Sequence, residues 1–224
     1  MAFQSTVYQE LISELNASGV TLIAVSKTKP VEDILQAYQE GVRDFGENYV
    51  QELTEKQSQL PADIKWHFIG HLQSNKVKYL APFVYLIHGV DSEKLLTEIN
   101  KQGKRNNRTI NCLLQVHIAK EETKFGFDET ELMELVGRLK ENPSSFDHVC
   151  ICGLMGMASF TDNPEVVEEE FRTLRLIFDR LKSITTSNIN FSVLSMGMSS
   201  DYRAAIAQGS NMVRIGSMLF GSRS

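Results

Sequence analysis

Short runs of β-branched and apolar residues alternate with longer segments of helical period along nearly the whole chain of 224 residues. The runs are almost continuously apolar, as expected of strands that are buried on both faces. Strands that alternate with helices in this way favour successive βα units and a parallel sheet. The expected strands are residues 21–25, 42–46, 66–70, 84–90, 112–118, 148–155, 191–196 and 212–216.

Helices are expected between these runs. Apolar residues spaced i, i+3, i+4, i+7 over 31–38 share one helix face, between Pro30, which suits a helix start, and Gly41, which suits a helix end. Apolar residues at alternating spacings of four and three over 167–181 predict the longest helix. An additional helix is expected before the first strand, at about residues 2–18.

These repeated units predict a single (β/α)8 TIM barrel, in one domain over residues 1–224 without a Pro/Gly/Ser-rich linker. The alternative is an open doubly wound sheet, which would want a glycine-rich turn after its first strand. The first turn here reads SKTKP, without glycine, and the pattern G-x-G-x-x-G follows none of the expected strands. The barrel is therefore favoured.

The charge and the apolar segments exclude several classes of protein. The formal net charge is -5 and basic residues do not cluster, which argues against nucleic-acid binding. The apolar stretches are shorter than the roughly 20 residues that span a bilayer, and the N-terminus lacks the pattern of a signal peptide. Cys112, Cys150 and Cys152 lie in apolar runs without C-x-x-C spacing, so we expect core packing rather than a metal site or a disulfide. A cytoplasmic protein without membrane contact is expected.

In a barrel of this kind, function lies at the carboxyl ends of the strands. Ser199 and Ser200 follow the seventh expected strand, directly before a helical segment, and Gly216 and Ser217 follow the eighth. Hydroxyls and backbone N–H groups at these two neighbouring strand ends suit a phosphate. The alternative is helix capping by the serines and a simple turn at the glycine. Because the features fall on adjacent strands, phosphate binding is favoured.

Lys27 follows the first expected strand, at the mouth of the barrel. Partial desolvation there would lower the pKa of its ammonium group and free the amine to attack a carbonyl carbon. The alternative is a rim lysine that keeps its ammonium group in water. Lys29 competes by position, but Pro30 forces it into an extended approach to the helix, so Lys27 is preferred.

Arg214 lies inside the last expected strand and needs an acceptor, since a buried arginine is rarely unpaired. The acceptor is either a ligand in the barrel mouth or a carboxylate, with Asp44 and Glu47 as candidates. His67 and His71 are four residues apart but span a strand and its exit, so metal binding is not expected; His71 is placed at the mouth. Together, an amine, an arginine and a phosphate cradle suit a phosphorylated aldehyde such as pyridoxal 5′-phosphate.

Five segments, in order along the chain, make a more specific pattern: AVSKTKP (24–30), FGENYVQE (45–52), WHFIGHLQSNK (66–76), LSMGMSSDYRAAI (194–206) and VRIGSMLFG (213–221). With these strings the chain resembles the pyridoxal phosphate homeostasis protein family. The resemblance implies a barrel similar to the N-terminal domain of alanine racemase. It also implies a role in vitamin B6 and amino-acid homeostasis, without an established catalytic reaction.

The resemblance further implies pyridoxal 5′-phosphate bound as an aldimine on Lys27. It places the cofactor phosphate on Ser199, Gly216 and Ser217, and Arg214 against the pyridine nitrogen. The other residues that it implies near the cofactor are Asn48, His71 and Met196. The chain departs from the family at His117, where asparagine is expected, and in the loop at 153–159, so no role is assigned to either.

Two further hypotheses compete with a carrier of pyridoxal phosphate. One is a racemase-like enzyme that uses the cofactor, and the other is a sugar-phosphate lyase with a Schiff-base lysine. A racemase of this fold needs a second domain with a catalytic tyrosine, which we do not expect here because the chain ends soon after the last strand. An arginine at the pyridine nitrogen would also make the cofactor a poorer electron sink.

A lyase is disfavoured because aldolases of this fold usually carry their lysine later in the barrel, an argument from fold analogy. We therefore expect a carrier that is not an enzyme and acts as a monomer, with pyridoxal-phosphate-dependent apo-enzymes as candidate recipients.

Overall fold

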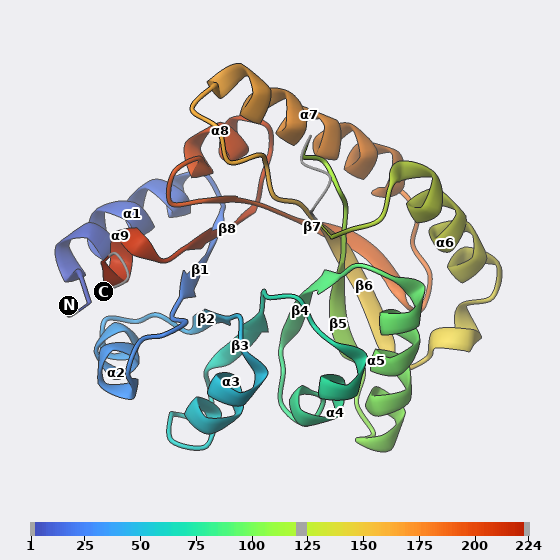
Figure 1. Ribbon diagram of the computed structural model, residues 1–224, viewed down its shortest axis with the longest axis horizontal. Helices are drawn as coiled ribbons and strands as arrows, with labels where there is room; N and C mark the ends of the chain where they lie inside the picture. The colour runs from blue at the N-terminus through green and yellow to red at the C-terminus, as the bar shows by residue number, and fades with distance from the viewer. Residues whose placement is uncertain (1–2, 120–124, 222–224) are drawn as a thin grey trace.

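The computed structural model describes residues 3–119 and 125–221. Within them, eight parallel strands close into a barrel in chain order, with β8 beside β1 (Figure 1). The expected TIM barrel is confirmed, and the open sheet is excluded by the β1–β8 pairing. The strands are β1 (Thr21–Val25), β2 (Asp44–Glu47), β3 (Lys65–Phe68), β4 (Leu86–Val90), β5 (Ile110–Gln115), β6 (Val149–Met155), β7 (Ile189–Met198) and β8 (Met212–Ile215).

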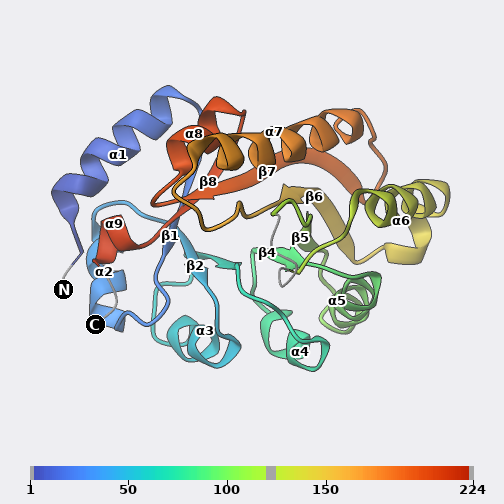
Figure 2. The ribbon, with the colours of Figure 1, turned by 45° about the horizontal axis from the view of Figure 1, so that its top comes forward.

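The helices lie outside the ring of strands, as Figures 1 and 2 show. The first and last helices lie side by side, and near them the rings of Phe3 and Phe220 pack together with their centroids 5.4 Å apart. The helices are α1 (Ser5–Ala17), α2 (Val31–Gln39), α3 (Val50–Gln57), α4 (Val77–Leu80), α5 (Glu93–Arg105), α6 (Glu129–Glu141), α7 (Pro164–Leu181), α8 (Tyr202–Ala207) and α9 (Ser217–Phe220), with 3-10 turns η1 (Ser74–Lys76) and η2 (Pro143–Phe146).

Each expected strand is present, with ends that differ by up to three residues. The largest difference is at β5, expected at 112–118. Its last apolar residues leave the sheet because Val116 pairs with Phe127 in an isolated bridge instead. In the described ranges, no helix is long and apolar enough to cross a membrane.

The three cysteines are free thiols. Cys112 is buried as expected, and Cys152, although partly buried, packs against the apolar cluster inside the barrel; the expectation of core packing is wrong for Cys150, which is only partly buried and belongs to neither apolar cluster. The side chains of Cys150 and Cys152 come from the alternate positions of β6 that are half exposed, next to buried Val149 and Ile151.

The core has two layers. The larger one fills the space between strands and helices and includes Met196, which is fully buried. The smaller one lies inside the barrel and is apolar at Ile23, Leu86, Leu113, Met155 and Met212. Strand residues alternate between the two layers. Buried polar side chains also face the barrel interior, and they include His67, His88, Ser195 and Arg214.

Candidate functional site

The carboxyl ends of all eight strands meet at one end of the closed barrel. Seven of the eight expected site residues lie at or just beyond these ends, because parallel strands bring their exits to the same face. Met196 instead points into the layer between strands and helices. The seven are Lys27 after β1, Asn48 after β2, His71 after β3, Ser199 after β7, Arg214 in β8, Gly216 after β8 and Ser217 at the start of α9.

Lys27 lies in a tight turn that leaves β1. The backbone N–H of Lys29 donates to the carbonyl of Ser26 at 3.0 Å, which closes the turn. Thr28 adopts φ +63°, a left-handed conformation that is unfavourable for a β-branched residue. The Lys29 amine donates to the carbonyl of Phe220 at 2.7 Å, so it is directed at the end of α9. Lys27, half buried, is the lysine that the turn places at the mouth.

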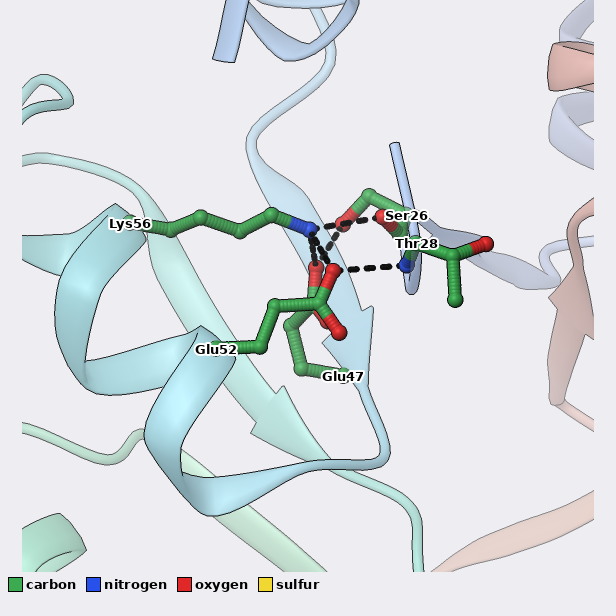
Figure 3. A network of polar contacts seen from close by, with 5 residues as sticks. All are labelled: Ser26, Thr28, Glu47, Glu52 and Lys56. Carbon is green, nitrogen blue, oxygen red and sulfur yellow. Dashed lines mark hydrogen bonds and ion pairs between the residues drawn. The ribbon is translucent and has the colours of Figure 1, made fainter. Parts of the chain in front are cut away.

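Figure 3 shows the network that holds this turn. The amine of Lys56, in α3, donates to the carbonyl of Ser26 at 2.8 Å, to Glu47 at 2.7 Å and to Glu52 at 2.6 Å. The Ser26 hydroxyl donates to Glu47 and the Thr28 N–H donates to Glu52, both at 2.6 Å. The three N–H bonds of the Lys56 ammonium group are thus all used. We call these five residues the turn clamp.

The ion pair at the centre of the turn clamp is buried, which decides its energetics. The side chains of Lys56 and Glu47 are 7% and 0% exposed. Burial raises the pKa of Glu47, although the nearby charge of Lys56 opposes the shift. The second carboxylate oxygen of Glu47 is buried without a hydrogen-bond partner among the described residues. Such a pair is costly to break, because one charge would remain buried alone.

Ser199 and Gly216 join the exits of β7 and β8. The N–H of Gly216 donates to the Ser199 hydroxyl at 3.3 Å. The alternative that Ser199 or Ser200 caps α8 is wrong, since Asp201 holds the cap position. A side chain at Gly216 would meet Val25 at 3.2 Å, so glycine lets the exits of β1 and β8 approach closely there.

Arg214 is 5% exposed, and no carboxylate of the described residues lies within hydrogen-bond distance of its guanidinium group. One terminal nitrogen donates to the carbonyl and the hydroxyl of Ser195 at 3.0 and 2.7 Å, and the other donates to the carbonyl of Gly156 at 3.1 Å. The expected alternative partners, Asp44 and Glu47, bind a histidine and a lysine instead.

The charge of Arg214 is therefore compensated only from a distance. Burial lowers its pKa to about 10, and the carboxylate of Asp201 opposes this shift. The side chain still carries its positive charge at neutral pH. Three of the five guanidinium N–H groups are used by the bonds to Ser195 and Gly156, and the other two meet no acceptor in the described part of the chain.

A chain of buried hydrogen bonds leads to Arg214 and was not expected from the sequence. His67 Nε2 lies 3.0 Å from the Asp44 carboxylate, and His67 Nδ1 lies 3.0 Å from His88 Nε2. His88 Nδ1 lies 3.2 Å from the Ser195 hydroxyl, which contacts Arg214. Burial lowers the pKa of both histidines.

His71 and Asn48 border the mouth on the side of β2 and β3. His71 Nδ1 pairs with Asp91 at 3.0 Å, and the ring stacks on Phe125 with centroids 4.1 Å apart. The amide oxygen of Asn48 is buried without a hydrogen-bond partner among the described residues. Both side chains line a cavity of about 690 Å³ that extends outward to Tyr49.

The residues at the mouth suit a phosphorylated aldehyde. They offer an amine on a firmly held turn, a buried cation with two remaining N–H groups, and a hydroxyl beside a glycine amide. The orphaned oxygen of Asn48 marks a place where a ligand donor would be stabilising, because a buried polar atom without a partner costs free energy. His117 is half buried, and the loop at 153–159 contributes the Gly156 carbonyl that accepts from Arg214.

Comparisons with known proteins agree with the class that fold and site define. The family described as "Alanine racemase, N-terminal domain" matches residues 8–224. An alanine racemase from Streptomyces lavendulae superposes with a TM-score of 0.76 at 15% identity, over 99% of this chain and 58% of that one, which shows the fold alone. The chain is thus a barrel of the alanine racemase N-terminal-domain class.

Relatives with higher sequence identity indicate a more specific family. The "Pyridoxal phosphate homeostasis protein" of Pasteurella multocida is 41% identical over 211 residues, which is 92% of this chain and 88% of the relative. PipY of Synechococcus elongatus, solved with PLP bound, is 35% identical with a TM-score of 0.86, over 97% of this chain and 99% of that chain. The chain belongs to the pyridoxal phosphate homeostasis protein family.

Proposed function

We propose that this protein binds pyridoxal 5′-phosphate covalently through Lys27 and serves pyridoxal phosphate homeostasis as a carrier. The observation that carries the proposal is the pair of lysines in the first turn. The turn clamp holds the backbone around Lys27, while the amine of Lys29 is bound to the Phe220 carbonyl. The relative that is solved with PLP bound supports the choice of ligand.

Each group at the mouth has a role in this proposal. When bound, the cofactor supplies an aldehyde that an amine attacks and a pyridine ring that withdraws electrons. Lys27 holds the aldehyde carbon, and the remaining N–H groups of Arg214 donate to the ring nitrogen. The phosphate is taken by Ser199, Gly216 and Ser217, since hydroxyls and backbone amides suit an anion. The residues proposed to border the ring are Asn48, His71 and Met196, the last through its main chain.

We also propose that the protein does not turn over amino acids. Arg214 only donates hydrogen bonds, so it leaves the ring nitrogen without a proton and weakens the ring as an electron sink. Residues 1–224 would then act as one domain and as a monomer in the cytoplasm, and would pass the cofactor to apo-enzymes that depend on it. Names of the relatives as homeostasis proteins support this role.

The test of Lys27 is chemical trapping. The protein is mixed with pyridoxal 5′-phosphate, reduced with borohydride and mapped by peptide mass analysis, alongside Lys27→Ala and Lys29→Ala. We expect the label on Lys27, its loss in Lys27→Ala and its retention in Lys29→Ala, the matched control. A label on Lys29, or an unlabelled wild-type protein, would overturn the proposal.

A further inference from the structure

A line of buried polar side chains runs inside the barrel, from near its amino end to the site. Asp44 is the first residue of β2, and Gly46, two residues further on, is level with His67 in β3. His67 is level with Leu86 in β4, so His88 lies two residues higher. Each step along the line is a hydrogen bond of 3.0 to 3.2 Å.

The line ends on Arg214 through Ser195. We propose that Asp44, His67, His88 and Ser195 form a hydrogen-bonded chain with one fixed direction, whose task is to position the guanidinium group of Arg214. These four are positioning residues. The part of the inference that concerns the cofactor rests on the proposed function, whereas the direction of the chain does not.

Packing alone does not account for such a chain. The inner layers of (β/α)8 barrels are dominated by branched apolar side chains. Two imidazoles in this position are tolerated only because they are hydrogen-bonded, since a buried polar group without a partner is destabilising. Here all four ring nitrogens of His67 and His88 have a partner, and both residues are fully buried.

The carboxylate end of the chain imposes its direction, and the arginine end is compatible with it. An ionised carboxylate only accepts, so His67 Nε2–H donates to Asp44 and His67 Nδ1 is left as an acceptor. His88 Nε2–H must then donate to His67, and His88 Nδ1 must accept from the Ser195 hydroxyl. An arginine only donates, so the Ser195 oxygen accepts from Arg214. If the chain ran in the opposite direction, His67 Nε2 would direct a lone pair at the Asp44 carboxylate.

The surroundings keep both imidazoles neutral. His67 faces Asp44, Lys65 and the ring of Tyr85, whose centroid lies 5.3 Å away. Burial lowers the pKa of His67 against the opposing effect of Asp44.

His88 faces His67, Ser195 and Arg214, and burial together with the nearby charge of Arg214 lowers its pKa well below the usual value. Among the described residues, the carboxylate that acts on Arg214 is that of Asp201, at the start of α8. Protonation of His88 would add a second cation beside Arg214, which the buried site opposes.

The chain acts on Arg214 by orienting one hydroxyl. Because the Ser195 proton is committed to His88, the oxygen presents a lone pair to Arg214 at 2.7 Å. Together with the Ser195 carbonyl at 3.0 Å, this fixes one terminal nitrogen of the guanidinium group on two acceptors. A planar group held in this way directs its remaining N–H groups along set lines.

The direction of the chain is measured by long-range proton–nitrogen NMR on the full-length protein without added ligand. We expect His67 and His88 to be neutral with the proton on Nε2 at pH 7. In Ser195→Ala, His67 and His88 should both keep the proton on Nε2, because Asp44 still accepts from His67 and His67 Nδ1 still accepts from His88. A proton on Nδ1 of His67 or His88 in the wild-type protein, or a charged ring, would overturn the chain.

Positioning is measured by titration with pyridoxal 5′-phosphate, followed by absorbance. Ser195→Ala should weaken binding by about tenfold, and Ser195→Thr, which keeps the hydroxyl, should recover most of it. Ser192→Ala makes the same change on the exposed side of β7 and should bind like the wild type. Equal binding by Ser195→Ala and wild type would refute positioning. If the wild type does not bind, the proposed function fails, and the NMR result still decides the chain.

Discussion

The turn clamp makes a sharp prediction about Lys56. Lys56→Met keeps the length of the side chain but removes its charge and its three hydrogen bonds of 2.6 to 2.8 Å. Glu47 is then left fully buried, with one oxygen already lacking a partner. Breaking a buried ion pair from one side costs about 3–5 kcal/mol, so we expect the free energy of unfolding to fall by that amount.

The loss of stability in Lys56→Met should depend on pH, and the pKa shift of Glu47 determines the direction of this dependence. In the variant the pKa of Glu47 should rise further above its usual 4.5, because the opposing charge is gone. A group whose pKa is higher in the folded than in the unfolded protein stabilises the fold most at a pH below its unfolded-state pKa. This stability is lost as the pH rises through its folded-state pKa. Lys56→Met should therefore be less destabilising at pH 5 than at pH 8.

Urea unfolding of the wild type and of three variants tests this prediction. Lys101→Met is the matched control, since that exposed lysine pairs with Glu98 at the surface, and it should change stability by under about 1 kcal/mol. Adding Glu47→Gln to Lys56→Met removes the stranded charge and should recover part of the loss. A loss below about 1 kcal/mol for Lys56→Met, or a loss that grows as pH falls, would refute the reasoning.

Three further predictions concern the phosphate, the histidines and turnover. Ser199→Ala should weaken pyridoxal 5′-phosphate by about tenfold to a hundredfold, from roughly 1.5–3 kcal/mol for one bond to a charged group, and should leave pyridoxal unaffected; equal losses for both ligands would contradict a phosphate role. His67 and His88 stay neutral when folded but bind protons when unfolded below about 6.5, so the free energy of unfolding should fall as pH drops from 6.5 to 5.5, by up to about 1.4 kcal/mol per histidine. A flat profile over that interval would contradict this assignment. Amino acids incubated in heavy water with the loaded protein should exchange their α-protons far more slowly than about 10 per second, a typical turnover; exchange near that rate that depends on Lys27 would show an enzyme.

The barrel was predictable because strands buried on both faces leave a strong signal. Apolar runs such as the one at β1 carry the period and the length of a strand in their own residues. Strand ends were less certain, since they depend on which neighbour pairs with them; the end of β5 is set by the bridge from Val116 to Phe127.

The site was predictable only where one residue carries the signal. Lys27 follows a strand directly, so its place at the mouth comes from the barrel itself. The partners of Arg214 could not be predicted in this way, because two of them are the carbonyls of Ser195 and Gly156, which no residue type reveals, and the third is the Ser195 hydroxyl.

Networks that join distant segments escaped prediction for the same reason. His88 and Ser195 are 107 positions apart, and their contact exists only when the barrel closes. One local signal was available: His67 sits between Trp66 and Phe68, which face outward, so alternation along the strand places it inside the barrel. Likewise, the spacing of Glu52 and Lys56 predicts an ion pair on α3, but its link to the first turn needs the fold.

A crystal structure of the protein with pyridoxal 5′-phosphate tests the central claim most directly. We predict continuous density from the Lys27 amine to the aldehyde carbon of the ligand, the phosphate on Ser199 and Gly216, and Arg214 within hydrogen-bond distance of the ring nitrogen. Density joined to Lys29, or a ligand held outside the barrel mouth away from Arg214, would contradict the account.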